Sequence, residues 1–142
     1  MTQQLQALLI RFGNSTNPFD EHNHMRVVRV DDGEAVVEVT LCRDSLNSWS
    51  TPHGGLLFAA ADVACGIATV SVRQEQCVTV SASVDFIAAA GSDGTLTAAA
   101  RVDHAGNKIC FCSAEVTDEA GRLIARLRTT MYFTGQPLPR QE

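Results

Sequence analysis

The sequence has few aromatic residues and no excess of positive charge. Aromatic side chains make up 6% of its 142 residues, and 11 Lys and Arg stand against 16 Asp and Glu, for a formal net charge of -5. Proteins that bind nucleic acid carry a basic stripe, so this class is excluded. The N-terminus has no basic segment followed by an apolar run, the pattern of a secretory signal peptide. We expect a cytoplasmic protein without a nucleic-acid partner.

Cysteine and histidine patterns of disulfide or metal sites are also missing. The number of cysteines is five, which is odd, and none forms a CxxC pair. This composition predicts reduced, mostly buried thiols rather than a disulfide framework or a zinc site. His22 and His24 stand in a turn-rich segment without a third ligand, so we expect no metal there. The cysteines are Cys42, Cys65, Cys77, Cys110 and Cys112.

One long apolar segment, residues 51–69, is present and predicts a buried helix. It is too short and too interrupted by Gly and Asp to predict a membrane span. Thr51 and Pro52 favour a helix start at that point. Gly54 and Gly55 then place backbone N–H groups at the positive end of the helix dipole. At about 100° per residue, one stripe of this helix holds Gly55, Phe58, Ala59, Asp62, Cys65 and Gly66.

Asp62 is the single carboxylate of this segment. A buried carboxylate without a partner is costly, so the residue needs either hydrogen bonds or a chemical role. Asp62 could cap a neighbouring loop, or it could be a catalytic base or nucleophile in a cleft that begins at the helix N-terminus. The residues alone leave both interpretations open.

The remaining chain shows the alternation of β-strands. Before the central helix we expect an amphipathic helix over 3–12, a loop over 13–24 and strands over 25–30 and 34–41. After the central helix we expect a loop over 70–76 and strands over 77–88, 95–103, 109–117 and 122–133. In the strand over 77–88, one face should carry Val78, Val80, Ala82, Val84, Phe86 and Ala88. The order predicts an α+β domain in which a curved antiparallel sheet wraps one helix on nearly all sides. We expect a single domain over 1–142, with a core over about 17–133 and a frayed tail over 134–142.

Apolar residues also remain for the outer face of this sheet. Another subunit should cover part of that face, so a homo-oligomer is expected. The residues are Ile87, Ile109, Phe111 and Ile124.

The order of elements and three spaced polar residues resemble acyl-CoA thioesterases of the hotdog fold, in the PaaI-like group named after phenylacetate degradation. In that pattern an Asn stands six residues before the His of a His-Gly-Gly motif, and an acid stands nine residues after it. Asn47, His53 and Asp62 have both spacings. The resemblance extends over about 17–133, most of the domain.

The resemblance implies a role for each of these residues. The Gly54 N–H, with Gly55 beside it, would polarise the thioester carbonyl. Asp62 would be the general base or the nucleophile, Asn47 would orient water or substrate, and His53 would have a positioning role. The acid and the N–H donor at one thioester would come from different subunits of a dimer, with a dimer of dimers as the further expectation.

The expected substrate is an aryl-, short- or medium-chain acyl-CoA, with no cofactor. Gly55 and Phe58 are candidate substrate contacts. Thr79 is a candidate near the acid, and Lys108 is one near the CoA nucleotide; a plain strand residue and a solvated turn lysine are the alternatives for these two. A hotdog hydratase or dehydratase, or a non-catalytic acyl-CoA-binding module, is the alternative function.

Overall fold

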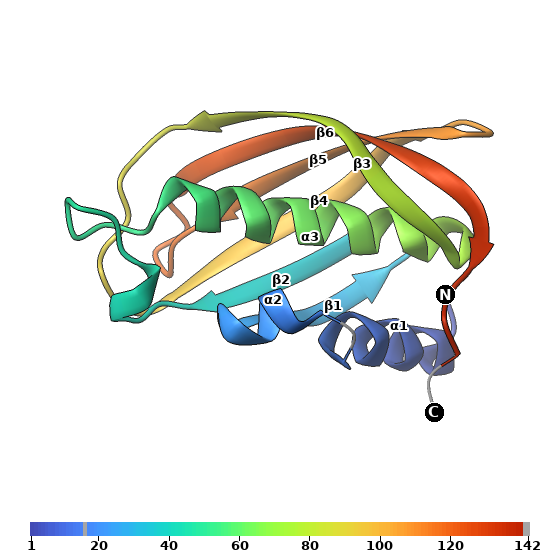
Figure 1. The fold of residues 1–142 in the computed structure, drawn as a ribbon, viewed down its shortest axis with the longest axis horizontal. Helices are drawn as coiled ribbons and strands as arrows, with labels where there is room; N and C mark the ends of the chain where they lie inside the picture. Colours follow the sequence, from blue (N-terminus) through green and yellow to red (C-terminus); the bar gives the residue numbers. More distant parts are fainter. Residues whose placement is uncertain (16, 141–142) are drawn as a thin grey trace.

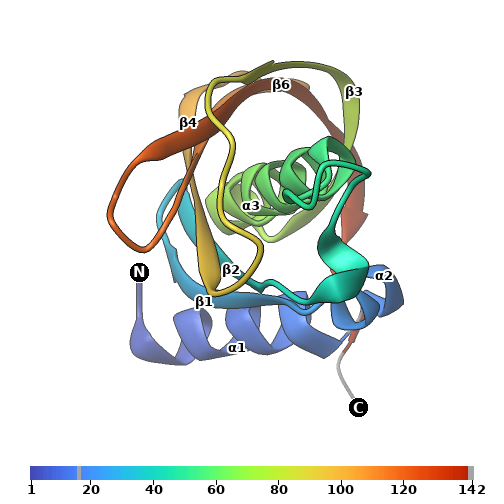
Figure 2. The same ribbon diagram turned by 90° about the vertical axis from the view of Figure 1, so that its left-hand side faces the viewer.

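A computed structural model describes residues 1–15 and 17–140 as a six-stranded antiparallel sheet curved around one long helix (Figures 1 and 2). The strand order is β1-β2-β4-β5-β6-β3. This confirms the predicted curved sheet around a central helix, with a short N-terminal helix beside it. The elements are α1 (Gln3–Ser15), α2 (Pro18–His22), β1 (Met25–Asp31), β2 (Glu34–Thr40), a 3-10 turn (Arg43–Ser45), α3 (Gly54–Arg73), β3 (Glu75–Phe86), β4 (Thr95–Ala105), β5 (Ile109–Thr117) and β6 (Leu123–Pro137).

The central helix α3 packs its small residues against the concave face of the sheet. Ala60, Ala61, Ala64 and Ala68 are at most 1% exposed, because alanines let the sheet backbone approach the helix closely. By length and composition α3 could cross a membrane, but 61% of its most apolar stretch is buried inside the fold, as in the core helix of many domains.

The start of α3 lies later than predicted. His53 is the N-cap, and its Nδ1 accepts a hydrogen bond from the Gly55 N–H at 2.8 Å. Pro52 instead forms an isolated β-bridge with Leu46, and the Thr51 hydroxyl donates to Asn47. The prediction of a cap at Thr51 and Pro52 is wrong because the loop before the helix satisfies these residues itself.

The prediction of a loop over 70–76 is also wrong. The helix continues to Arg73, and Gln74 reverses the chain in one residue with a left-handed φ of 53°. The Ser71 hydroxyl accepts a hydrogen bond from the Gly33 N–H at 2.8 Å, which ties the last turn to the β1–β2 hairpin. Tertiary contacts of this kind extend a helix beyond its local signals.

The strand β3 does not keep one apolar face. Its register with β6 shifts between Thr79 and Ser81, so Val80 is an extra residue in the ladder. Thr79 therefore faces α3, whereas Val78 and Val80 are 51% and 56% exposed. The prediction assumed one unbroken alternation through 77–88. The extra residue at the bulge reverses which face successive side chains take, so the residues before the bulge lie on the opposite face from the one predicted.

The sheet does not close around α3. The edge strands are β1 and β3, and α1 and α2 lie beside β1, so α3 is uncovered between α2 and β3 (Figure 2). The expectation that α3 is buried on nearly all sides is therefore wrong along one stripe. Cys65, which the sequence placed on this stripe, is instead buried against the sheet. The half-buried stripe consists of Phe58, Ala59, Asp62, Val63 and Gly66.

Three further expectations need correction. The predicted loop over 13–24 contains α2, which has Asn17 as its N-cap and Pro18 in its first turn. Ile124 is fully buried, not on the outer face of the sheet. The strand β6 continues through the predicted tail to Pro137, where it pairs with β3, and Leu138 packs against the core.

Candidate active site

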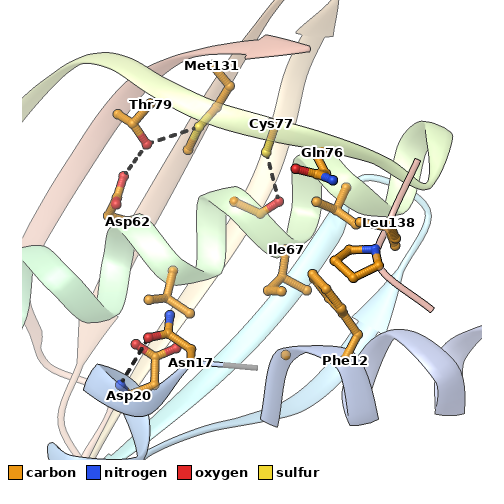
Figure 3. Close-up of a pocket in the computed structure, with 15 residues that line it drawn as sticks. Phe12, Asn17, Asp20, Asp62, Ile67, Gln76, Cys77, Thr79, Met131 and Leu138 are labelled. Carbon is orange, nitrogen blue, oxygen red and sulfur yellow. Dashed lines mark hydrogen bonds between the residues drawn. The ribbon is translucent and has the colours of Figure 1, made fainter. Parts of the chain in front are cut away.

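Asp62 projects from the open stripe of α3 toward β3 (Figure 3). Its Oδ1 accepts a hydrogen bond from the Thr79 hydroxyl at 2.8 Å. Thr79 Oγ1 also lies 3.2 Å from the Met131 sulfur, but the carboxylate is the stronger acceptor for the single hydroxyl proton. Within residues 1–15 and 17–140 no other hydrogen bond reaches the Asp62 side chain. One carboxylate oxygen is thus held in place, and the other is available to a ligand.

The Asp62 side chain borders a cavity of about 410 Å³, which we call the Asp62 cavity. The helices α1, α2 and α3, the strands β3 and β6 and the C-terminal segment meet around it (Figure 3). Its walls are mainly apolar, with a few polar groups, as is typical of sites for small organic molecules. The lining residues are Phe12, Gly13, Asn17, Asp20, Asp62, Val63, Gly66, Ile67, Val70, Gln76, Cys77, Thr79, Met131, Leu138 and Pro139.

Asp20 is a second acid of this cavity, and the sequence analysis missed it. It is 5% exposed, and its Oδ1 has no hydrogen-bond partner among the described residues. Removal from water, together with the negative charge of Asp62, raises the pKa of Asp20 to about 6. The signal was the helix start at Asn17 and Pro18, which places Asp20 in a first helical turn instead of in a loop.

The N-terminus of α3 offers one free N–H. The Gly55 N–H donates to the His53 side chain, and the Leu56 and Leu57 N–H groups donate to the His53 carbonyl at 2.9 and 3.2 Å. In this turn of the described chain, only the Gly54 N–H is therefore unused. Nδ1 of His53 is an acceptor here, so the neutral ring carries its proton on Nε2. Of the two glycines predicted as donors, the geometry keeps Gly54.

Asn47 organises the loop before α3. Its Oδ1 accepts hydrogen bonds from the Trp49 N–H at 2.9 Å and from the N–H and hydroxyl of Thr51, both at 3.2 Å. The carbonyl oxygen is therefore committed to the loop, and the Nδ2 group is the part that could meet a substrate.

Asn47 and Gly54 border a second cavity of about 320 Å³, the Gly54 cavity. The Phe86 ring covers Gly54 so closely that a Cβ atom there would lie 3.0 Å from Phe86 Cζ. A side chain at this position would have to displace the exposed Phe86 ring by a few tenths of an ångström. The other lining residues are Thr51, Pro52, Leu57, Ile87, Ala88 and Ala89.

The two cavities lie at different heights along α3. Gly54 and Asp62 are eight residues apart in one helix, which is about 12 Å along its axis. A thioester group spans only a few ångströms, so the two residues of one chain cannot contact the same carbonyl. Phe58 stands between them on the half-buried stripe.

The structure places Lys108 away from both cavities. It is exposed in the turn between β4 and β5, which Arg73 holds through a hydrogen bond to the Asn107 carbonyl at 2.8 Å. Arg73 ends α3, so Lys108 lies at the opposite end of this helix from Gly54. In the part of the chain that is described, no three His, Cys, Asp or Glu side chains could hold a metal ion, and all five cysteines are free.

Comparison with known proteins gives consistent matches. Residues 50–125 match the family model of the thioesterase superfamily. Acyl-coenzyme A thioesterase PaaI of Escherichia coli K12 is 31% identical over 109 residues, which is 77% of each chain.

Solved structures agree. The E. coli PaaI protein from the phenylacetic acid degradation operon superposes with a TM-score of 0.85 at 25% identity, over 92% of this chain and 99% of that one. A hypothetical thioesterase of Streptococcus pneumoniae TIGR4, solved with coenzyme A, has a TM-score of 0.75 at 29% identity over 80% and 88%. That protein was also solved with an aspartate, and with a threonine, replaced by alanine.

Proposed function

The chain belongs to the thioesterase superfamily, and from this membership we propose that it is a hotdog-fold enzyme that hydrolyses acyl-CoA to a free acid and CoA. One observation carries the assignment of residues. A carboxylate held by a hydroxyl, Asp62 with Thr79, stands on the open stripe of the helix whose first turn has one unused N–H, that of Gly54.

The proposed reaction uses these groups in turn. The Gly54 N–H, at the positive end of the helix dipole, holds the carbonyl oxygen as it gains negative charge. The free Asp62 oxygen removes a proton from the attacking water, or bonds to the carbonyl carbon itself and is then released by water. The carbon–sulfur bond breaks and its electron pair leaves on the CoA sulfur. A thiolate is stable enough to leave with little protonation.

We propose that each site uses two chains. Since about 12 Å separates Gly54 from Asp62 within one helix, the Asp62 of one chain and the Gly54 of a second would meet at one thioester. The unpaired edge of β3, with its exposed valines Val78 and Val80 next to the open stripe, supports a second copy on this side. The proposed assembly is a dimer or a dimer of dimers, and the exposed Phe111 on the outer sheet face supports the larger one.

The remaining predicted contacts are assigned within this dimer. Asn47 Nδ2, His53, Gly55 and Phe58 would border the thioester, and Lys108 would meet the phosphates of CoA. The apolar walls of the Asp62 cavity suit an aryl or a short- to medium-chain acyl group. The E. coli relative from a phenylacetic acid degradation operon supports phenylacetyl-CoA as a first substrate to assay. We propose a cytoplasmic enzyme without a cofactor.

A test mixes two inactive variants, Asp62→Asn and Gly54→Pro. Proline removes the N–H at the first helical position, which tolerates it. In an equal mixture that has been refolded together, half of the dimers contain one chain of each variant. If a site takes one residue from each chain, one of the two sites in such a dimer is intact, so about a quarter of wild-type activity returns. Each variant alone should be folded and inactive toward acyl-CoA. A mixture as inactive as its components, despite exchange of chains shown by mass spectrometry, would contradict the two-chain site.

The hydratase alternative finds no support in the geometry. It requires a histidine and an acid that act together as an acid–base pair. The Nδ1 of His53 accepts the Gly55 N–H in the helix cap, and His53 is not among the residues that line either cavity. No described histidine lines either cavity.

A further inference from the structure

Asp20 is a buried acid that the proposed reaction does not use. It lies on α2, is 5% exposed, and has an Oδ1 that no donor of the described chain reaches. It borders the Asp62 cavity, on the side opposite Thr79 (Figure 3). A buried polar atom without a hydrogen bond destabilises a fold, so native structures rarely keep one without a purpose.

A structural role does not account for Asp20. In a capping box, the side chain three residues after the N-cap accepts a hydrogen bond from the N-cap N–H. Among the described residues, the contact at this position runs instead from the Asp20 N–H to the Asn17 side chain, at 3.4 Å. Asp118 shows the contrast, since its carboxylate accepts hydrogen bonds from the N–H groups of Ala120 and Arg122.

The surroundings of Asp20 point to a ligand with a hydrogen-bond donor. The cavity offers a second acid, Asp62, and the neutral amides of Asn17 and Gln76, but no cationic side chain among its described lining residues. Asp20 also borders a neighbouring cavity of about 430 Å³, whose other polar and charged lining residues are Asn14, Glu21, His24, Arg26 and Thr40. Among the described residues, no donor reaches the Oδ1 of Asp20.

We propose that Asp20 is a specificity-determining residue, whose carboxyl group receives an O–H or N–H donor carried at the far end of the acyl group. The preferred substrates are then acyl-CoA esters with a terminal hydroxyl or amine, and not plain hydrocarbon esters. This inference rests on the proposed thioesterase function. A site with a buried unpaired acceptor discriminates strongly against a ligand that lacks the donor, because the acceptor then stays desolvated and unpaired.

The experiment compares hydrolysis of three sets of CoA esters. Hexanoyl-, octanoyl- and decanoyl-CoA are each prepared plain, with a terminal hydroxyl and with a terminal amine, so that chain length varies the reach of the donor. Release of CoA gives kcat/KM for the wild type and for Asp20→Val, which removes the acceptor at similar volume. Asp20→Asn keeps one carbonyl acceptor, and Glu21→Val is the matched control on the exposed side of α2.

We expect the wild type to prefer at least one donor-bearing ester over its plain parent by about tenfold or more. Asp20→Val should bring this ratio close to one, because only the donor-bearing ester loses a hydrogen bond. Asp20→Asn should keep the preference for the hydroxyl ester and lose the preference for the amine, because an amide does not pair with a cation. Glu21→Val should leave all ratios unchanged.

Two results would overturn the inference, and they differ from failure of the proposed function. If the plain esters are preferred at every length, or if Asp20→Val keeps the wild-type ratio, Asp20 does not select the substrate. If Asp20→Val does not fold, an unchanged amine preference in Asp20→Asn overturns the inference equally. If no ester is hydrolysed by the wild type, the thioesterase proposal fails and this inference with it.

Discussion

The two cavities along α3 are built in different ways. The Gly54 cavity is lined by residues between 47 and 57 and by the single segment 86–89, and the hydrogen bonds of Asn47 and His53 at the helix start are made with close sequence neighbours. The Asp62 cavity combines α1, α2, α3, β3, β6 and the C-terminal segment. Its central hydrogen bond joins Asp62 on α3 to Thr79, the residue just before the bulge of β3.

This difference separates two tasks, the supply of the N–H donor and the placement of the acid with the cavity walls around it. A backbone N–H at a helix start is fixed once the local turn has formed, whatever the rest of the chain does. The acid and the walls of the Asp62 cavity depend on how distant elements pack. The first cavity should therefore respond to substitutions through the reaction rate, and the second through substrate selection, pH and stability as well.

The largest effect is expected from Gly54→Pro. Removal of the donor should lower kcat by about a hundredfold to a thousandfold, the range observed when one oxyanion donor is lost. Gly54→Ala is the control, because its Cβ disturbs Phe86 in the same way but keeps the N–H. Steady-state kinetics with an acyl-CoA and circular dichroism give the comparison. Equal rates for the two variants would mean that the N–H does not act on the substrate.

The next effect is on stability, and it concerns Asp20. Its folded pKa of about 6 lies above the ordinary value of 3.8, so the folded state binds the proton more tightly than the unfolded state. Its contribution is present at low pH and is lost as the pH rises through about 6. Compared with Asp20→Asn, the wild type should lose about 1 to 2 kcal/mol of unfolding free energy between pH 4 and pH 7, allowing for solvent screening.

Urea denaturation of both proteins across this pH range provides the measurement. A constant difference between wild type and Asp20→Asn would show that Asp20 is not desolvated. Glu21→Gln, on the exposed side of α2, should give no such slope.

Thr79→Ala should have a smaller effect on catalysis. Without the hydroxyl, Asp62 loses its hydrogen bond at Oδ1 and its fixed orientation. We expect kcat to fall about tenfold, the equivalent of one hydrogen bond of about 1.4 kcal/mol. Thr79→Ser keeps the hydroxyl and should retain most of the rate. A Thr79→Ala enzyme as fast as the wild type would limit Thr79 to a packing role.

The smallest effect is expected from His53→Ala. Loss of the N-cap acceptor should lower the free energy of unfolding by about 1 kcal/mol, measured by denaturation in urea. His53→Asp supplies another cap acceptor and should restore the stability. If His53→Ala is as stable as the wild type, the hydrogen bond to Gly55 does not stabilise α3.

Local signals predicted most of the fold correctly. The alternation over 34–41, 95–103 and 109–117 corresponds closely to β2, β4 and β5, because these central strands keep one face on α3 throughout. The prediction failed at β3, where the bulge at Val80 changes which face is buried. An edge strand has a partner on one side only, so its register can adapt to the helix below it.

The candidate site was predicted in part. The resemblance to the thioesterase pattern pointed to Asn47, His53, Gly54 and Asp62, whose roles stay predictions. The structure defines their contacts: Asn47 and His53 hold backbone groups, and in the first turn of α3, within the described chain, Gly54 keeps a free N–H. Asp20 was missed because nothing near it in sequence shows that α2 turns its acid toward α3. Burial of that kind depends on packing between elements.

The sequence by itself determined the buried helix, the loop and N–H donor at its start, and the acid two turns further on, because these follow from short-range spacing and backbone hydrogen bonds. Only the tertiary structure decided which stripe of the helix stays open, how Thr79 reaches Asp62 and why the Oδ1 of Asp20 has no hydrogen-bond partner among the described residues. Each of these depends on contacts between elements far apart in the chain, which local pattern does not encode.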